Sequence, residues 1–271
     1  MIFKRLKLKL LLALLICGSA YAQQRDAYVA IGDIYRSDGS IVTPEDYVAQ
    51  GYTDGIGVVC YVDDTGYHGW VMYYKDNGSN IAWSSALYSH TGVPQKAAFR
   101  DTTTPANGLI KDCNGKANTD IIAALDTYSQ ENFPAFFYAK SLGDGGWYVP
   151  AAGQLNYMVG QTGALNASLM LIEGSTCVLR SDHSLNDFNV NYWASDEYSG
   201  NDSQAWYMKD NCSFTYISKA NTSTARVRAF HDFWGEKGKW GFDSAQPPRP
   251  HNLINTKQQT KQWKQQNTFY Y

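Results

Sequence analysis

Charged side chains are scarce in this sequence, and neither sign dominates. They make up 18% of the 271 residues, and the formal net charge is -2. Proteins that bind nucleic acids gather Lys and Arg on one face, where these residues neutralise phosphates. The composition therefore argues against a nucleic-acid partner.

The motifs of common catalytic sites are also missing. The sequence contains no H-E-x-x-H, no G-x-S-x-G, no phosphate-binding loop and no dinucleotide fingerprint. Its five histidines are scattered, and none has a nucleophile and an acid at a spacing that indicates catalysis. We therefore expect a protein that is not an enzyme.

No apolar run approaches the roughly 20 residues that a membrane-spanning helix needs. The run over residues 10–16 is short, follows four basic residues and precedes Ala20-Tyr21-Ala22. This pattern is typical of a cleaved secretory signal. Cys17 would suggest a lipoprotein, but the residue before it, Ile16, is large. We predict a signal peptide over residues 1–22 and an exported chain that is periplasmic, on the cell surface or extracellular, with no membrane span after cleavage.

Four cysteines remain after cleavage, and an even count in an exported chain indicates disulfides. Three pairings are open, and we favour those that close the smaller loops. Metal ligation is the rival interpretation, but no two cysteines have C-x-x-C spacing. The predicted disulfides are Cys60 with Cys113 and Cys177 with Cys212.

Hydrophobic periodicity predicts an α+β protein. Alternation predicts a hairpin over residues 56–62 and 69–75, joined by the turn sequence Asp63-Asp64-Thr65-Gly66. Helical spacing follows the predicted N-cap at residues 118–120. The expected order is a hairpin, then helices, then antiparallel strands. The predicted strands are 27–34, 56–62, 69–75, 176–179, 192–194, 205–209, 214–219 and 225–230, and the predicted helices are 121–128, 134–140, one from 151 and 166–172, with a long irregular connection over 79–115.

Several sequence blocks resemble a known family. They are G-W-Y-V-P at 146–150, Y-W-A-S at 192–195, A-W-Y at 205–207 and R-V-R-A-F at 226–230. In this order they are similar to exported bacterial proteins with a DUF1566-type domain, a family that is similar in turn to C-type-lectin-like domains and the formylglycine-generating-enzyme fold. The best match covers residues 118–231. Gln154 and Ala194 depart from the family pattern, which often has Glu and Ser there.

The resemblance implies one lectin-like domain over residues 23–235, with antiparallel sheets, two main helices and long irregular loops. Its first and last strands would pair. Four matching residues would have structural roles: Trp147, Pro150, Trp193 and Trp206. Arg226 and Arg228 are also predicted to be structural, because a planar guanidinium group can bind carboxylates or backbone carbonyls inside the fold. Binding of an anionic ligand is their alternative role.

The polar segment between the two tryptophans of NYWASDEYSGNDSQAWYMKD is the predicted ligand-binding loop. Its alternative is a solvated loop with no ligand, because loops are polar in either case. The candidate ligand-binding residues are Asp196, Glu197, Tyr198, Asn201 and Asp202.

No cofactor is expected, although Asp and Asn over residues 182–191 and 196–202 leave a structural calcium ion open. The sequence lacks the Glu-Pro-Asn, Gln-Pro-Asp and Trp-Asn-Asp segments of calcium-dependent sugar-binding lectins. Sugar binding by aromatic stacking stays open.

We expect an exported binding module at the bacterial cell envelope, such as an adhesin, whose partner is a carbohydrate or a protein surface. One alternative is a structural or assembly subunit of an envelope or appendage. The other is an enzyme of the formylglycine-generating type, which needs a reactive cysteine pair. Residues 236–271 are rich in Gln and Lys and predict a disordered tail.

Overall fold

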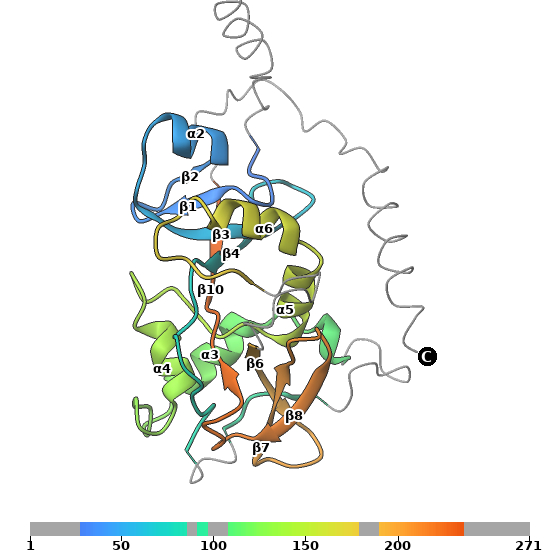
Figure 1. Ribbon diagram of the computed structural model, residues 1–271. Coiled ribbons are helices and arrows are strands. Elements are labelled where there is room, and N and C mark those ends of the chain that lie inside the picture. Colours follow the sequence, from blue (N-terminus) through green and yellow to red (C-terminus); the bar gives the residue numbers. More distant parts are fainter. Residues whose placement is uncertain (1–27, 86–90, 97–107, 179–189, 236–271) are drawn as a thin grey trace, which may run out of the picture.

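The computed structural model describes residues 28–85, 91–96, 108–178 and 190–235, which form a mixed α+β fold with two sheets (Figure 1). The first sheet has five antiparallel strands in the order β10-β4-β3-β1-β2. Its strands are β1 (Ile34–Arg36), β2 (Ile41–Val42), β3 (Gly55–Val62), β4 (His68–Tyr73) and β10 (Phe230–Trp234).

The second sheet is centred on an antiparallel meander from the C-terminal half of the described chain. Two short strands, β5 and β9, pair in parallel with β6. The remaining pairs, β6 with β7 and β7 with β8, are antiparallel. The strands are β5 (Gln95–Lys96), β6 (Asn191–Tyr198), β7 (Gln204–Met208), β8 (Phe214–Ser218) and β9 (Ala225–Arg226).

The β3–β4 hairpin forms where the alternating pattern predicts it. The Asp63 carboxylate accepts hydrogen bonds from the amides of Thr65 and Gly66, which closes the turn. Gly66 has φ +74°, a left-handed conformation that glycine adopts without steric cost. Gly69 allows a close backbone approach, because a Cβ there would collide with the carbonyl oxygen of Tyr61.

The helices begin at identifiable signals. In α2 (Pro44–Ala49) the Thr43 hydroxyl caps the Asp46 amide at 3.0 Å. In α4 (Pro134–Lys140) a proline occupies the first turn, where its missing N–H costs nothing. The other helical segments are η2 (Leu109–Lys111), α3 (Gly115–Ala123), α5 (Ala152–Val159) and α6 (Thr162–Leu169).

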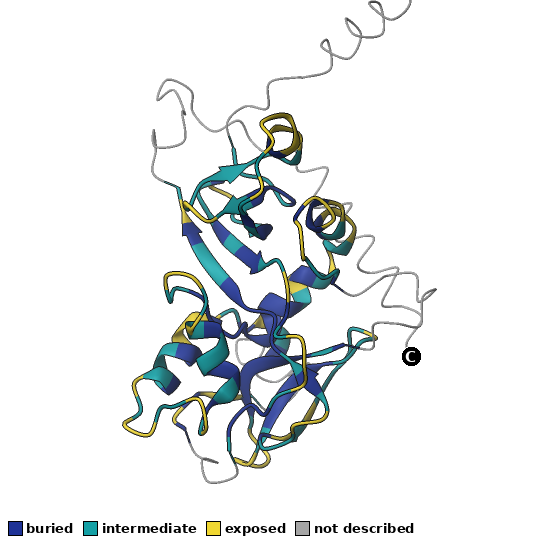
Figure 2. Cartoon of the chain, turned by 60° about the vertical axis from the view of Figure 1, so that its left-hand side comes forward, coloured by how far each residue is buried: buried dark blue, intermediate teal, exposed yellow. Residues whose placement is uncertain are grey.

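Helix α5 links the two sheets, because it contacts β3 of the first and both β6 and β7 of the second. Two buried clusters form the core. One joins the first sheet to α5, α6 and the second sheet, and the other surrounds Trp147 and Trp193 beside α3 and α4. Figure 2 shows buried residues along the strands of both sheets and exposed residues in the outer loops. Within the described residues, no helix has the length and apolar character to cross a bilayer.

The structure corrects several predicted strands. The strand predicted over residues 27–34 begins only at Ile34, and residue 27 lies outside the described residues. The predicted last strand, 225–230, is two strands in different sheets, β9 and β10. The first and last strands are not neighbours, since β10 pairs with β4 and β1 pairs with β2 and β3. Residues 176–178 form no strand.

Helix predictions were closer. The prediction over residues 134–140 matches α4, whereas α3 and α6 begin and end several residues earlier than predicted. Helix α2 was not predicted, and five α-helices of 6 to 9 residues replace the two main helices expected in the described part. The predicted signal peptide and the predicted disordered tail lie outside the described residues.

Candidate binding site

Two of the predicted ligand-binding residues are not in a loop. Strand β6 continues through Tyr198, so Asp196 and Glu197 belong to the strand, and their exposures are 0% and 1%. The expectation that these two carboxylates face solvent is therefore wrong. They are buried because partners from distant parts of the chain compensate the loss of water.

Glu197 forms a buried ion pair. Its Oε1 lies 2.7 Å from Nζ of Lys219, which is 2% exposed, and it also accepts a hydrogen bond from the hydroxyl of Thr91. The Lys219 ammonium lies 4.7 Å from the centre of the Trp83 ring. Burial lowers the pKa of Lys219, although the bond to Glu197 opposes this shift. The pair joins β6 to the residue that follows β8.

Asp196 belongs to a pair of carboxyl groups. Its Oδ2 accepts the Ala152 amide at 2.7 Å, at the start of α5. Burial raises its pKa well above the usual value, and the neighbouring Asp112 adds to the shift. The pKa of Asp112 is lowered: burial opposes this, but hydrogen bonds from Asp196 and the Asn114 amide and the ammonium of Lys96 outweigh it. The raised pKa of Asp196 and the lowered pKa of Asp112 favour a hydrogen bond in which the protonated Asp196 carboxyl donates to the Asp112 carboxylate.

The other three candidates lie at the end of β6 and in the β6–β7 turn. Tyr198 stacks on Tyr216 of β8 with ring centres 3.7 Å apart. Asn201 and Asp202 are exposed. The Asn201 side chain accepts hydrogen bonds within its own turn, and Asp202 accepts one from Gln95 at 2.6 Å. These residues form a small surface without a described cavity.

The three tryptophans assigned structural roles are buried. Trp147 and Trp193 are 1% and 0% exposed in one cluster, and Trp206 is 4% exposed in the other. The indole N–H groups of Trp193 and Trp206 donate to backbone carbonyls of Ile81 and Lys96. The carbonyl of Pro150 accepts the amide of residue 195 at 2.8 Å.

The two arginines bind groups within the fold. Arg226 lies 3.4 Å from the carboxylate of Asp76. Arg228 is fully buried and donates to the backbone carbonyls of Tyr73, Thr176 and Cys177. Each guanidinium group therefore has at least one partner inside the fold.

All four cysteines are free thiols in the structure, so the predicted disulfides are not formed in it and stay a prediction. Cys60 is buried, and its thiol donates to the Trp70 carbonyl at 3.3 Å. Burial raises the pKa of Cys113 to about 12, with further contributions from Asp112 and Asp196. A thiol with so high a pKa is a poor nucleophile at neutral pH.

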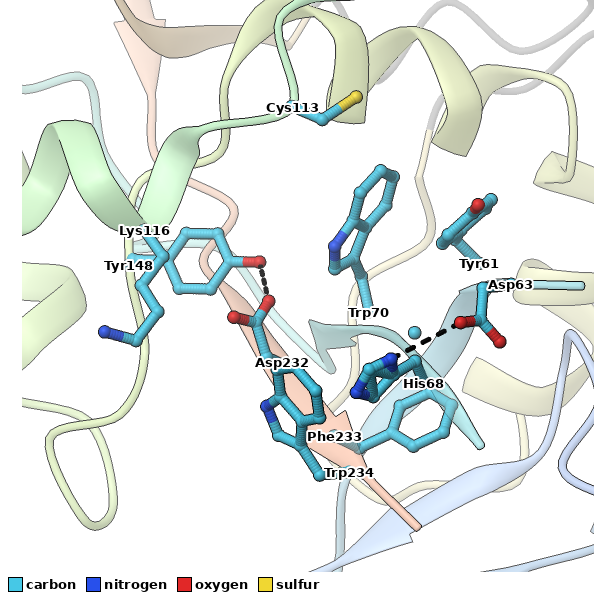
Figure 3. A pocket seen from close by; sticks show the side chains of 11 residues that line it. Tyr61, Asp63, His68, Trp70, Cys113, Lys116, Tyr148, Asp232, Phe233 and Trp234 are labelled. Atoms are coloured by element: carbon cyan, nitrogen blue, oxygen red, sulfur yellow. Dashed lines mark hydrogen bonds and ion pairs between the residues drawn. The ribbon is translucent and has the colours of Figure 1, made fainter. Parts of the chain in front are cut away.

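A pocket of about 260 Å³ opens at the end of the first sheet (Figure 3). Its lining comes from β3, the β3–β4 turn, β4, β10 and the start of α3, together with Tyr148. None of these positions was predicted as a ligand-binding site. The lining residues are Tyr61, Asp63, His68, Gly69, Trp70, Cys113, Lys116, Tyr148, Asp232, Phe233 and Trp234.

Three lining residues form a row across neighbouring strands. Tyr61 is paired with Trp70, and Trp70 is paired with Asp232, so all three side chains lie on one face of the sheet. The Tyr61 ring stacks on Trp70 with centres 4.3 Å apart and an angle of 28°. In Figure 3, Tyr148 and Asp232 lie on the other side of the indole. An aromatic surface and a carboxylate therefore border the same space.

The alternation of side chains along β4 and β10 explains why this sheet face is buried at one end and exposed at the other. Met72 and Phe230, two residues further in, are paired and fully buried in the core. His68 and Trp234, two residues further out, are also paired, and Trp234 is 71% exposed. The same sheet face is thus core at one end and an aromatic pocket at the other.

A hydrogen-bonded chain fixes Asp232. The Gln154 amide donates to the Tyr148 hydroxyl at 2.9 Å, and that hydroxyl donates to Oδ1 of Asp232 at 2.6 Å. Burial raises the pKa of Tyr148 well above its usual value, and the charge of Asp232 adds to this shift. Tyr148 therefore keeps its proton and acts as a donor. Gln154 is held in turn by the amides of Gly115 and Ala151.

The two basic residues at the rim have carboxylate partners. Nδ1 of His68 lies 3.3 Å from Oδ2 of Asp63, and its ring meets Trp234 edge to face. Nζ of Lys116 lies 2.6 Å from Asp120. In the described part of the chain, no group of three or more His, Cys, Asp or Glu residues is arranged to hold a metal. Most of the predicted calcium segment 182–191 lies outside that part.

No family model matches the chain, and no curated protein matches it. The resemblance to DUF1566-type proteins therefore stays a prediction, and the function is argued from the geometry of the pocket.

Proposed function

We propose that this protein is an exported binding module that holds a saccharide in the pocket between β4, β10 and α3. The observation that carries the proposal is the row of Tyr61, Trp70 and Asp232, which places an aromatic surface beside a fixed carboxylate. The volume, about 260 Å³, is just below the roughly 300 to 1,000 Å³ of typical ligand pockets, which suits one sugar ring.

A sugar ring suits this lining because it has two kinds of surface. Its C–H groups form an apolar face that packs on an indole, while its hydroxyls need hydrogen-bond partners. Trp70 offers the face, and Asp232 offers acceptor oxygens. Binding of this kind needs no calcium and no catalytic group. It agrees with the absence of catalytic motifs from the sequence.

The wider proposal is a C-type-lectin-like domain at the bacterial cell envelope, acting as an adhesin or surface-ligand receptor. Its support is the α+β fold with mainly antiparallel strand pairs, the order of the sequence blocks over residues 118–231, and the signal-like N-terminus. A protein-surface ligand and an assembly role are the competing outcomes of the experiment.

The experiment is a glycan array probed with the purified chain, followed by titration calorimetry with the best-binding saccharide. Trp70→Ala should weaken binding by about 2 kcal/mol, the usual cost of removing an aromatic hot-spot side chain. Tyr216→Ala is the matched control, because Tyr216 is also a part-exposed aromatic residue but belongs to the second sheet.

Three results would contradict the proposal. An array without any bound glycan would favour a protein partner or an assembly role. Loss of affinity in Tyr216→Ala, with Trp70→Ala unaffected, would move the site to the surface around Tyr198. Equal loss in both variants, with unchanged thermal stability, would argue against a single pocket.

A further inference from the structure

We propose that the saccharide bound in this pocket carries an ammonium group, as an amino sugar does. This inference rests on the proposed function and adds the chemical class of the ligand. It follows from the charges that border the pocket and from the aromatic rings beside them.

The two basic residues that line the pocket are each paired with a carboxylate other than Asp232. Asp63 and Asp232 are the lining carboxylates, and His68 and Lys116 are the lining basic residues. Lys116 bonds to Asp120, and in Figure 3 its ammonium points away from Trp70. His68 is paired with Asp63. Between described residues, no ion pair involves Asp232.

Asp232 has one carboxylate oxygen to spare. Oδ1 accepts the Tyr148 hydroxyl, whereas Oδ2 has no hydrogen-bond partner within the described residues and is not a buried atom. Because Tyr148 is a neutral donor, it orients the carboxylate without cancelling its charge. A ligand ammonium at Oδ2 would form a charge-assisted hydrogen bond, which is roughly twice as strong as a neutral one.

The aromatic rings strengthen the same preference. Trp70 lies opposite Asp232 in the sheet, so a group held at Oδ2 is beside the indole. A cation near an aromatic face is attracted by the negative charge of the ring face, and tryptophan gives the strongest attraction. A neutral hydroxyl or acetamide group gains no such attraction. The pocket therefore combines the two features that select an ammonium over a neutral group.

Titration calorimetry with two tetrasaccharides tests the inference. The glucosamine tetramer and the N-acetylglucosamine tetramer share one backbone and differ at the amino group. The glucosamine form should bind at least tenfold more tightly, which corresponds to about 1.4 kcal/mol. The preference should shrink in high salt, because salt screens charge.

Two variants assign the preference to Asp232. Asp232→Asn should remove the tenfold preference by losing affinity for the glucosamine form alone. Tyr148→Phe removes the hydrogen bond to Asp232 but leaves its charge, so the preference should persist. Thermal melts establish whether both variants fold. If Asp232→Asn does not fold, the ligand preference of Tyr148→Phe still tests the inference.

The outcomes separate the two proposals. Equal or tighter binding of the N-acetylated tetramer would overturn the ammonium inference and leave the saccharide pocket intact. Choline chloride is the third arm, and binding of choline without either tetramer would overturn both the saccharide assignment and the amino-sugar inference. Binding of none of the three, together with an empty glycan array, would overturn the proposed function itself.

Discussion

Removing one partner of the Glu197–Lys219 pair should strongly destabilise the fold. Both side chains are almost fully buried, and their charged atoms are 2.7 Å apart. Glu197→Ala leaves the buried ammonium beside the Trp83 ring without its carboxylate, and Lys219→Met leaves the carboxylate beside the Thr91 hydroxyl without its ammonium. Breaking a buried pair in this way typically costs about 3 to 5 kcal/mol.

The double variant Glu197→Gln with Lys219→Met should recover most of that loss. It removes both charges together, and the glutamine carbonyl still accepts the Thr91 hydroxyl. Replacing a buried pair by neutral groups of similar volume is often neutral or stabilising. Asn201→Ala is the matched surface control, and it should change stability by no more than about 0.5 kcal/mol.

Urea denaturation of the four proteins and the wild type measures these differences. The refuting result is a Glu197→Ala midpoint equal to that of Asn201→Ala, since that equality would return Glu197 to a solvated loop. A double variant no more stable than Lys219→Met would also contradict the reasoning, because removing the charge of Glu197 as well would then have recovered nothing.

Three further predictions concern buried groups. Burial raises the pKa of Asp196 in the folded chain, so its protonated side chain contributes its full stabilisation at pH values below the pKa of the unfolded chain. This contribution is lost as pH rises through the pKa of the folded chain. Asp196→Asn should therefore gain stability relative to wild type as pH rises, while the exposed Asp126→Asn should not; parallel curves would contradict the shared proton. Trp193→Ala should lose about 3 to 5 kcal/mol in denaturant melts through transfer and cavity terms, and normal stability would show that this ring is not in the core. Cys113, with its pKa raised to about 12, should react with iodoacetamide at pH 8 far more slowly in the native chain than in urea, and equal rates would refute its burial.

The hairpin was predictable from the sequence, because both of its determinants are local. The alternation in β3 and β4 and the turn residues around Asp63 lie within a few positions of one another. The aromatic face was also visible in principle, since His68, Trp70 and Met72 occupy alternate positions of one strand. Their partner strand was missed beyond Phe230, although Phe230, Asp232 and Trp234 alternate in the same way.

Local sequence patterns could not predict the strand pairing that forms the pocket. Trp70 and Asp232 are neighbours only because β10 returns to β4 from far along the chain. The burial of Asp196 and Glu197 has the same cause. The polarity of these two side chains suggests a loop when their partners are unknown. In the structure, Asp112 beside Asp196 and Lys219 beside Glu197 allow both side chains to be buried in a strand. Sequence patterns identify the polar residue but not the distant group that compensates its burial.

The central claim is that a saccharide binds against Trp70, and indole N–H signals in an NMR titration test it directly. Trp83, Trp193 and Trp206 donate their indole N–H groups to backbone carbonyls inside the fold. Signals of Trp70 and Trp234, assigned by Trp→Phe substitution, should shift on addition of the glucosamine tetramer, while those three stay unchanged. A shift of Trp206 alone, with Trp70 and Trp234 unmoved, would place the ligand at the second sheet and contradict the account.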